Sequence, residues 1–309
     1  MVLSERCLIM ENINIYLLLF ISVIITLIYG ILRNYYSKKN VKTVTDYYAF
    51  NFLSSILSTV ILIALSGGIQ LPSLYTLILG IIFGIVTALA AIANLQALNI
   101  GPMSYTSVII TASMIIPALS GSLIWNEQIS IWQYIGMLLM VVSIAFSVDK
   151  KSNEKSSSVK WLLLCMTAFL FGGSIGIMQK FHQSSVYSEE LSEFLIIAFL
   201  ISTIFSFGMY QWYSKRKKIP KSISFSFKSS TFIMAVVSGI FIALANQINL
   251  YLSGVMNSAI FFPVVNGGGL LLTAIVAIVF FKEKLSKKQW FGLIIGIIAI
   301  LLLCNLILF

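Results

Sequence analysis

Few residues in this chain could support acid–base, nucleophilic or metal chemistry. Of its 309 residues, ten are Asp or Glu and one is His. Cys7, Cys165 and Cys304 stand far apart, so their spacing predicts neither a disulfide framework nor a metal site. With His182 as the single histidine, a histidine-based metal centre or a Ser–His–Asp triad has little to work with. We therefore expect no metal, no other cofactor and no enzymatic activity.

The amides that lie inside long apolar runs are more informative. Asn94, Asn246, Gln247 and Asn249 lie toward the ends of two such runs. An amide both donates and accepts hydrogen bonds. In a membrane-spanning helix it would prefer a cavity or a partner helix. We interpret these four residues as solute-binding candidates; helix-to-helix contacts or helix capping are the alternatives.

A second group of candidates lies in the apolar run that follows. Asn257, Pro263, Asn266 and Gly267 fall within it, and Gly268 and Gly269 come directly after. Proline removes a backbone donor, and glycines favour either a loose helix or very close packing. Unwound backbone at membrane depth is tolerated only where it lines a cavity or packs on protein. This pattern predicts a solute-contacting or gating element, with a glycine packing surface as the alternative.

Three further residues are candidates on weaker grounds. Thr111 lies close to Thr106, Ser113 and Pro117, which give a fainter version of the same polar face. Tyr29 and Trp161 are placed to reach a cavity, although rings near helix ends are usually interface anchors.

The elements that carry these residues are long apolar segments. The chain is 59% apolar and 10% charged, whereas soluble domains average about 45–50% and about 25%. This composition excludes a single soluble domain, a disordered chain, a disulfide scaffold and an ordinary soluble enzyme. A spanning helix needs roughly 20 residues. We predict an all-α polytopic membrane protein with ten transmembrane helices, near residues 14–34, 47–66, 73–97, 103–125, 131–148, 160–179, 192–213, 230–251, 256–281 and 290–308.

The basic residues orient this arrangement. Eighteen of the 20 Lys and Arg residues fall in odd-numbered loops, and Arg6 and Lys180 are the exceptions. The positive-inside rule then places the odd loops in the cytoplasm and both termini outside. The net charge of +10 indicates contact with anionic lipid rather than with nucleic acid. Arg33 and Lys180 end helices, so we expect both to snorkel to the surface. Met10 is an alternative start, because the first helix follows it almost at once.

The chain also repeats itself. In the third helix, seven residues recur 155 positions later, and around the fourth loop five residues recur 156 positions later. Chance matching between apolar helices explains the polar pairs Asn94/Asn249 and Glu127/Glu283 poorly. We infer a first repeat at 1–148, a cytoplasmic linker at 149–159 and a second repeat at 160–309. Five helices in each repeat give the two halves opposite orientations in the membrane. The recurring positions are Thr76, Gly84, Ala88, Leu89, Ala90, Asn94 and Leu95, then Glu127, Ser130, Gln133, Gly136 and Ile144.

Glycine and alanine spacing supports close helix packing. Gly80, Gly84 and Ala88 are spaced by four residues, and Ala235, Gly239 and Ala243 repeat the pattern. Such small-xxx-small spacing lets helices approach closely. It favours a packed bundle, and it leaves a homodimer open.

Two stretches resemble a known family. Residues 94–102 run through Pro117 to Glu127, and residues 249–254 run through Pro263 to Glu283. The two stretches match each other in register. With them, essentially the whole chain resembles the drug/metabolite transporter superfamily in its EamA-type branch. The resemblance implies two inverted five-helix repeats around a central cavity. It also implies movement of small organic solutes, often by export.

We therefore expect a secondary transporter in the cytoplasmic membrane that exports an amino acid, metabolite or drug by alternating access. A nucleotide-sugar or phosphometabolite exchanger would need basic residues at membrane depth to pair phosphates. An intramembrane enzyme would need clustered catalytic groups, and a non-transporting membrane protein is the remaining alternative. The partners expected are the solute and membrane lipid, with no nucleic acid.

The acidic residues bear on energy coupling. All ten lie in a terminus, a loop or a terminal helix turn, so none is central in the membrane. Glu193 is the nearest candidate for proton coupling. We expect Asp46, Glu189 and Glu190 to cap helix N-termini. Glu127 and Glu283 match the terminal Glu of the family that the chain resembles, which implies a role in orientation and helix termination rather than in transport chemistry. Facilitated diffusion, exchange and a proton carried elsewhere are the alternatives to coupling through Glu193.

Overall fold

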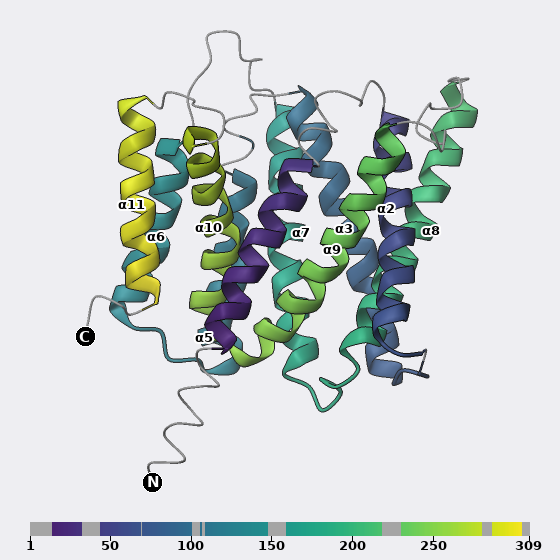
Figure 1. The fold of residues 1–309 in the computed structure, drawn as a ribbon, viewed down its shortest axis with the longest axis horizontal. Coiled ribbons are helices and arrows are strands. Elements are labelled where there is room, and N and C mark those ends of the chain that lie inside the picture. Colours follow the sequence, from purple (N-terminus) through teal and green to yellow (C-terminus); the bar gives the residue numbers. More distant parts are fainter. Residues whose placement is uncertain are drawn as a thin grey trace. The chain divides into compact units, whose positions relative to one another are not determined.

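The structure, a computed structural model, describes residues 14–32, 44–68, 70–100, 106, 109–147, 159–217, 230–279 and 286–304. Throughout these residues the secondary structure is helical, with short connecting turns (Figure 1). A first helix spans Asn14–Leu32. The elements that follow are α2 (Val44–Leu65), α3 (Leu74–Ile100), η1 (Ala112–Met114), α5 (Ile115–Trp125), α6 (Ile131–Ser147), α7 (Val159–Gln183), α8 (Leu191–Lys217), α9 (Ser230–Val255), α10 (Ser258–Val279) and α11 (Lys287–Leu303).

Among these described helices, six are long and apolar enough to cross a membrane: Asn14–Leu32, α2, α3, α7, α8 and α9. Two shorter apolar helices cover Ile109–Trp125 and Ile131–Phe146. These lengths and compositions are those of a multi-pass membrane protein. Several predicted boundaries agree within about three residues, but α8 ends at Lys217 rather than near 213 and α9 at Val255 rather than near 251. Helix α7 continues to Gln183 rather than ending near 179. The extra turn of α7 places Lys180 and His182 on the helix. Residues 149–158 of the expected linker, Met10, Arg33, Glu283 and residues 101–105 lie outside the described residues, whereas Val159 begins α7.

The chain forms two compact units, and each unit combines segments from both sequence halves. Unit 1 contains the described parts of residues 1–24, 89–180 and 252–309. Unit 2 contains those of residues 25–88 and 181–251. The compact units therefore differ from the consecutive halves that repeat along the sequence.

In unit 2 the most extensive helix pair is α2 with α8. The Asn51 side chain donates to the Ser206 hydroxyl at 3.3 Å, and the hydroxyls of Ser55 and Ser202 lie 3.3 Å apart. Because residue numbers rise along α2 while those of the partners fall along α8, the two helices are antiparallel. The helices are second in their respective halves.

In unit 1 the most extensive pair is α6 with α11, which run side by side in Figure 1. Gln133 donates its amide to the Leu303 carbonyl at 3.3 Å, and Ser143 donates its hydroxyl to the Gly292 carbonyl at 2.6 Å. This pair is also antiparallel, and its members are the last helices of the two halves. Helix α10 packs against α5, α6 and α11.

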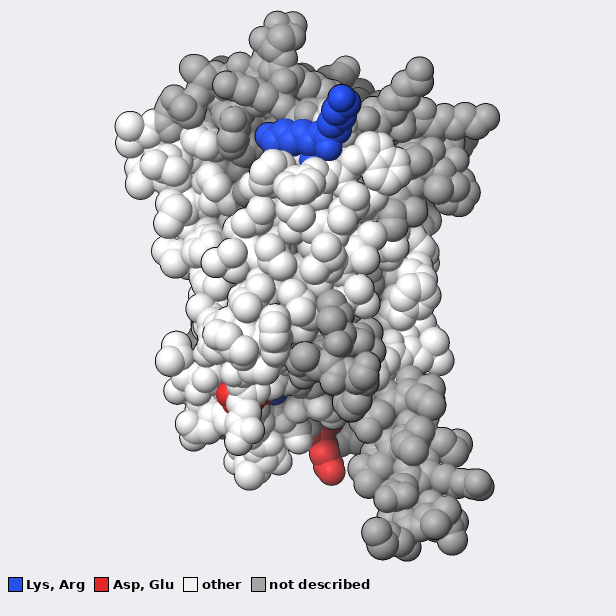
Figure 2. Space-filling model, turned by 90° about the vertical axis from the view of Figure 1, so that its left-hand side faces the viewer, with Lys and Arg blue, Asp and Glu red and all other residues white. Residues whose placement is uncertain are grey.

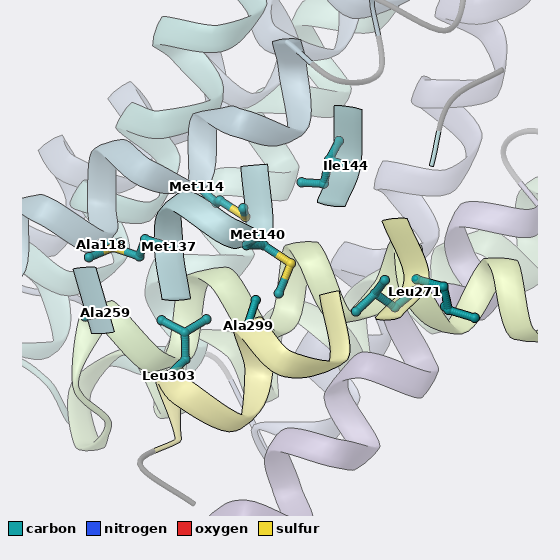
Figure 3. Close-up of a cluster of buried hydrophobic side chains, with 10 residues drawn as sticks. Met114, Ala118, Met137, Met140, Ile144, Ala259, Leu271, Ala299 and Leu303 are labelled. Carbon is teal, nitrogen blue, oxygen red and sulfur yellow. The ribbon is translucent and has the colours of Figure 1, made fainter. Parts of the chain in front are cut away.

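The core of unit 1 lies among these four helices (Figure 3). Its buried side chains are almost all aliphatic or methionine, which adapts to irregular gaps. Because lipid is as apolar as these side chains, van der Waals packing between them supplies the main favourable energy of this core. The buried residues are Met114, Ala118, Met137, Met140, Ile144, Ala259, Leu271, Leu293, Ala299 and Leu303.

Helices α6 and α11 begin in the same way. Before α6, the Gln133 backbone N–H donates to the Ser130 hydroxyl, and the Ser130 N–H donates to the Gln133 side chain. Ser286 and Gln289 form the same reciprocal pair before α11. This arrangement is a capping box, which satisfies two backbone donors at a helix start. The sequence repeat Ser130/Ser286 and Gln133/Gln289 thus reproduces one local structure twice.

Glycines lie where helices approach most closely, and the predicted packing role is confirmed. A methyl group on Gly84 of α3 would lie 2.5 Å from the Ala198 carbonyl oxygen of α8. One on Gly239 of α9 would lie 2.8 Å from the Ser54 carbonyl oxygen of α2. The Ser58 hydroxyl of α2 donates to the carbonyl of Gly239 at 2.8 Å. Only a residue without a side chain permits such spacing.

The charged residues of α11 lie only at its start. Lys287 and Lys288 begin this helix and are exposed, and none of its later residues is charged. On the face that Figure 2 shows, most of the visible blue lies at one end and the visible red lies near the other, and the wall of the molecule between them is uncoloured. An uncharged wall of this kind suits contact with hydrocarbon.

Replacing Gly84 with Ala should destabilise the protein by about 1–3 kcal/mol, because the new methyl group meets backbone of α8 that cannot move aside. Gly208→Ala on α8 is the matched control, since a methyl group there has no neighbour within 4 Å. Thermal unfolding in detergent, followed by fluorescence-detected size exclusion, compares the two. Equal melting temperatures for both variants would show that the Gly84 contact is unimportant.

Candidate functional site

Four of the predicted site residues lie in α10 or directly before it, and the first turn of this helix is capped. Asn257 precedes the helix. Its side-chain oxygen accepts from the Ala259 N–H at 2.9 Å, and its backbone carbonyl accepts from Ile260 and Phe261. The Asn257 amide also donates to the Gln128 carbonyl at 3.3 Å. These contacts make Asn257 the N-cap of α10.

The middle of α10 has one packed face and one polar position. Pro263 is buried inside the helix, which continues through it. Gly267 is also buried, and a side chain there would collide with Met140 of α6. Asn266, by contrast, is exposed, and its amide donates to the Phe262 carbonyl one turn earlier at 2.9 Å. The side-chain oxygen of Asn266 is thus the polar group that α10 presents at this depth.

A buried ion pair lies at the start of the same helix. Lys180 Nζ at the end of α7 is 2.6 Å from Glu127 Oε1, and the two side chains are 6% and 14% exposed. Glu127 Oε2 accepts from the Ser258 N–H at 2.8 Å. The lysine also donates to the Met256 carbonyl at 3.1 Å. The carboxylate therefore faces the N-terminus of α10 and the ammonium faces the end of α9, which are the favourable ends for each charge.

The end of α5 brings Glu127 into this position. Asn126 adopts a left-handed conformation with φ 52°, and the Glu127 backbone N–H donates to the Gly121 carbonyl at 3.0 Å. A side chain on Gly121 would collide with the Glu127 carboxylate and with Ser258. The expectation that Lys180 snorkels is wrong. Its ammonium contacts the Glu127 carboxylate and the Met256 carbonyl in place of water. Glu127 directly follows the end of α5, and the structure adds Lys180 as its charge partner.

The other unit 1 candidates are less clearly functional. Trp161 is buried, and its indole N–H donates to the Thr106 hydroxyl at 2.7 Å. It packs with Ala97 and Cys165, which favours a packing role. Asn94 and Thr111 are half-buried, and Thr111 immediately precedes η1 without capping it.

In unit 2, the predicted amides lie on α9. Asn246 donates to the Ile242 carbonyl of its own helix at 2.8 Å. Gln247 donates to the Ser192 hydroxyl of α8 at 3.3 Å, and its side-chain oxygen is buried with no hydrogen-bond partner among the described residues. The remaining unit 2 candidates are half-buried: Asn249, Tyr29 and Glu193.

A hydrogen-bonded cluster that sequence reasoning missed lies in unit 2, between the start of α3 and the turn before α8. Glu190 Oε2 accepts from the Ser73 hydroxyl at 2.8 Å and from its backbone N–H at 3.0 Å. Ser73 in turn accepts from the Thr76 N–H at 3.2 Å. The expectation that Glu190 caps a helix holds, but the helix it serves is α3. Thr76 Oγ1 lies 3.3 Å from Nε2 of His182, which is completely buried.

The surroundings of Glu190 perturb its acidity. Burial raises the pKa of this carboxyl, but hydrogen bonds from Thr76 and Ser73 and the nearby His182 outweigh it, so the pKa lies below its ordinary value. A lowered pKa means that the carboxylate stabilises the fold at neutral pH. That contribution is lost as the pH falls through the lowered value.

The structure thus divides the eleven predicted solute-contact residues, with seven in unit 1 and four in unit 2. It brings four of them together in α10 or directly before it. The Lys180–Glu127 pair had one sequence signal: Lys180 is one of two basic residues outside the odd loops. His182 had none, because a single histidine suggests no metal site. In the described part of the chain, no cluster of three His, Cys, Asp or Glu residues could hold a metal ion.

Comparison with known proteins gives a family and a fold. The sequence profile of the EamA-like transporter family matches residues 11–148 and, separately, residues 159–305. A solved structure, described only as the crystal structure of a protein, has a TM-score of 0.69 and 11% sequence identity. The similarity covers 95% of this chain and 97% of that chain, and at this identity it shows the fold alone. No curated protein matches the sequence significantly.

Lys180→Met should destabilise the protein by about 3–5 kcal/mol, because it leaves the Glu127 carboxylate buried without its partner. Lys287→Met is the matched control, since Lys287 is exposed and its removal changes the net charge equally. The free energy of unfolding in detergent micelles measures both. A double-mutant cycle with Glu127→Gln isolates the pair. If Lys180→Met unfolds no more easily than Lys287→Met, the ion pair does not hold this end of unit 1 together.

Proposed function

Because the chain belongs to the EamA-like transporter family, we propose that it is a secondary transporter that carries a small organic solute across the cytoplasmic membrane. The proposed solute is an amino acid, a metabolite or a drug. We propose that the protein exports it, and that it does so by alternating access. The proposal includes ten transmembrane helices arranged as two inverted five-helix repeats.

The observation that carries this proposal is the pairing of corresponding helices. Second helices α2 and α8 pack antiparallel, and so do last helices α6 and α11. Antiparallel packing of equivalent elements is what two repeats of opposite orientation would produce. It supports inverted repeats independently of the family match, because it rests on hydrogen bonds between named side chains and carbonyls.

The solute path in this proposal is lined by amides and hydroxyls. In unit 1 the leading contact is Asn266 on α10, because its side chain is exposed on the helix. In unit 2, taken by itself, the leading contact is Gln247 on α9, because its buried side-chain oxygen has no hydrogen-bond partner among the described residues. An uncharged lining suits a neutral or zwitterionic solute. The other proposed contacts are Asn257, Pro263, Gly267, Asn246, Asn249, Asn94, Thr111, Tyr29 and Trp161.

A solute that carries phosphate fits the described residues less well. Phosphate recognition calls for Lys or Arg free to pair with it. Lys180 is buried, but its ammonium already contacts Glu127 and the Met256 carbonyl. Because the Lys180 ammonium is already paired, a solute without phosphate fits these residues better.

The identity of the solute can be found directly. An untargeted comparison of metabolites in cells with and without the gene nominates candidates, and purified protein in liposomes tests each one. Transport of a nominated solute above protein-free liposomes supports the proposal. Absence of transport for every nominated solute contradicts it.

Asn266→Leu should reduce transport of that solute strongly, by about tenfold for one lost hydrogen bond of roughly 1.4 kcal/mol, while folded protein persists in the membrane. Asn14→Leu is the matched control, because Asn14 is an exposed asparagine at the start of the first helix. Uptake into liposomes is compared at equal amounts of monodisperse protein. Full activity in Asn266→Leu would remove α10 from the solute path.

Orientation gives a separate test. We propose that the Lys- and Arg-rich loops face the cytoplasm, so a single cysteine placed in segment 218–229 should react with a membrane-impermeant maleimide only after permeabilisation. A cysteine at Ser184, which is exposed in the turn after α7, should react in intact cells. The background is a variant with Cys7, Cys165 and Cys304 replaced by Ser. The reverse pattern would invert the orientation.

A further inference from the structure

His182 is the one histidine of the chain, and its side chain is buried among side chains of α3, α7 and α8 in unit 2. Its ring is completely buried on the last turn of α7. One face stacks on Phe194 of α8, with ring centroids 4.4 Å apart and planes inclined by 29°. Its two nitrogens each have a polar neighbour: Gln183 at Nδ1 and Thr76 at Nε2.

These neighbours fix the protonation state of the ring. The Gln183 amide nitrogen lies 3.1 Å from Nδ1 and also donates to the Ser188 carbonyl at 3.2 Å. An amide NH₂ group only donates, so Nδ1 accepts and carries no proton. The neutral ring therefore has its proton on Nε2, from which it donates to the Thr76 hydroxyl at 3.3 Å.

One charged group faces the ring among the described residues. Thr76 joins His182 to the Glu190 carboxylate, which also holds the two hydrogen bonds from Ser73. The groups on the other sides carry no charge: the Phe194 ring on α8, the Gln183 amide on α7 and Thr76 on α3. Tyr75, the residue before Thr76, carries a titratable phenol, which donates to the Phe181 carbonyl at 3.2 Å rather than to the ring. A carboxylate held one hydroxyl away is the counter-ion that a buried imidazolium needs.

We infer that His182 is a proton-binding site through which the transporter couples solute movement to a proton gradient. This inference rests on the proposed transport function and assigns coupling to His182 in place of Glu193. A proton from water adds to Nδ1, where a new N–H bond forms. The proton on Nε2 stays and continues to donate to Thr76, and Glu190 balances the positive charge. Deprotonation returns the proton to water.

Proton binding at Nδ1 also moves a neighbour. The Gln183 amide can no longer donate to Nδ1, so it must turn its oxygen toward the ring, which breaks its bond to the Ser188 carbonyl. Ser188 lies in the turn that leads into α8 and precedes Glu190 by two residues. Protonation therefore acts on the starts of α3 and α8 at once, through Glu190 and through this turn.

The first test uses the fact that a histidine-labelled sample gives a single imidazole signal. Protein with isotope-labelled histidine, in lipid nanodiscs, is titrated by NMR. We expect the ring to titrate while the protein stays folded, with the new proton on Nδ1. In Glu190→Gln the midpoint should move toward lower pH by about one unit or more. Glu189→Gln is the matched control, because Glu189 is exposed and carries the same charge one residue away.

Two outcomes of the titration overturn the inference. One is a ring that does not titrate before the protein unfolds. The other is a midpoint that moves no further in Glu190→Gln than in Glu189→Gln. Neither outcome depends on knowing the solute, and neither touches the proposed transport function.

The second test uses liposomes and the solute identified above. In wild-type protein an imposed pH gradient should stimulate transport. In His182→Gln the stimulation should be lost while exchange of labelled for unlabelled solute continues, and Glu193→Gln should keep the stimulation. A His182→Gln variant that still responds to the gradient contradicts the inference, as does loss of the response in Glu193→Gln alone. Absence of transport by the wild type contradicts the proposed function instead.

Discussion

The structure depends on close approach of helix backbones at positions that lack a side chain. Lipid offers no hydrogen-bonding partners, so hydroxyls inside a membrane protein must find protein acceptors. In both units a serine of one helix donates to the carbonyl of a glycine on another: Ser58 to Gly239 in unit 2, and Ser143 to Gly292 in unit 1. The missing side chain brings the carbonyl within reach: in unit 2 the contact joins α2 to α9, and in unit 1 it lies within the antiparallel pair of α6 and α11.

A second constraint acts at the end of α7. Lys180 and His182 are two residues apart on this helix, yet each contacts a cluster in a different unit. In each cluster a carboxylate accepts from backbone at the start of a helix: Glu127 at Ser258 of α10, and Glu190 at Ser73 of α3. Each carboxylate thus compensates unsatisfied backbone N–H groups, and each is held by a residue distant in sequence.

Sequence patterns predicted the helical fold well because hydropathy and repeat spacing are local or periodic. They also anticipated the packing of Gly84 and Gly239 and the similar starts of α6 and α11. They could not predict which helices share a core, since that depends on long-range pairing such as α2 with α8. The error at Lys180 has the same origin: whether a lysine snorkels or is buried depends on Glu127, 53 positions earlier in the chain. Asn257 and Asn266 look alike in sequence, but one caps a helix and the other is exposed on it.

The composition of each unit from both halves has a consequence for how the protein is made. Ser55 on α2 meets its partner Ser202 on α8, which is 147 residues further along the chain. At about 5–20 residues per second, the ribosome needs roughly 7–30 s to supply that partner. During this interval the hydroxyls on α2 are already in the membrane, and the helix that will cover them has not been translated. Until the second half arrives, the Ser55 hydroxyl therefore lacks the partner that it has in the folded protein.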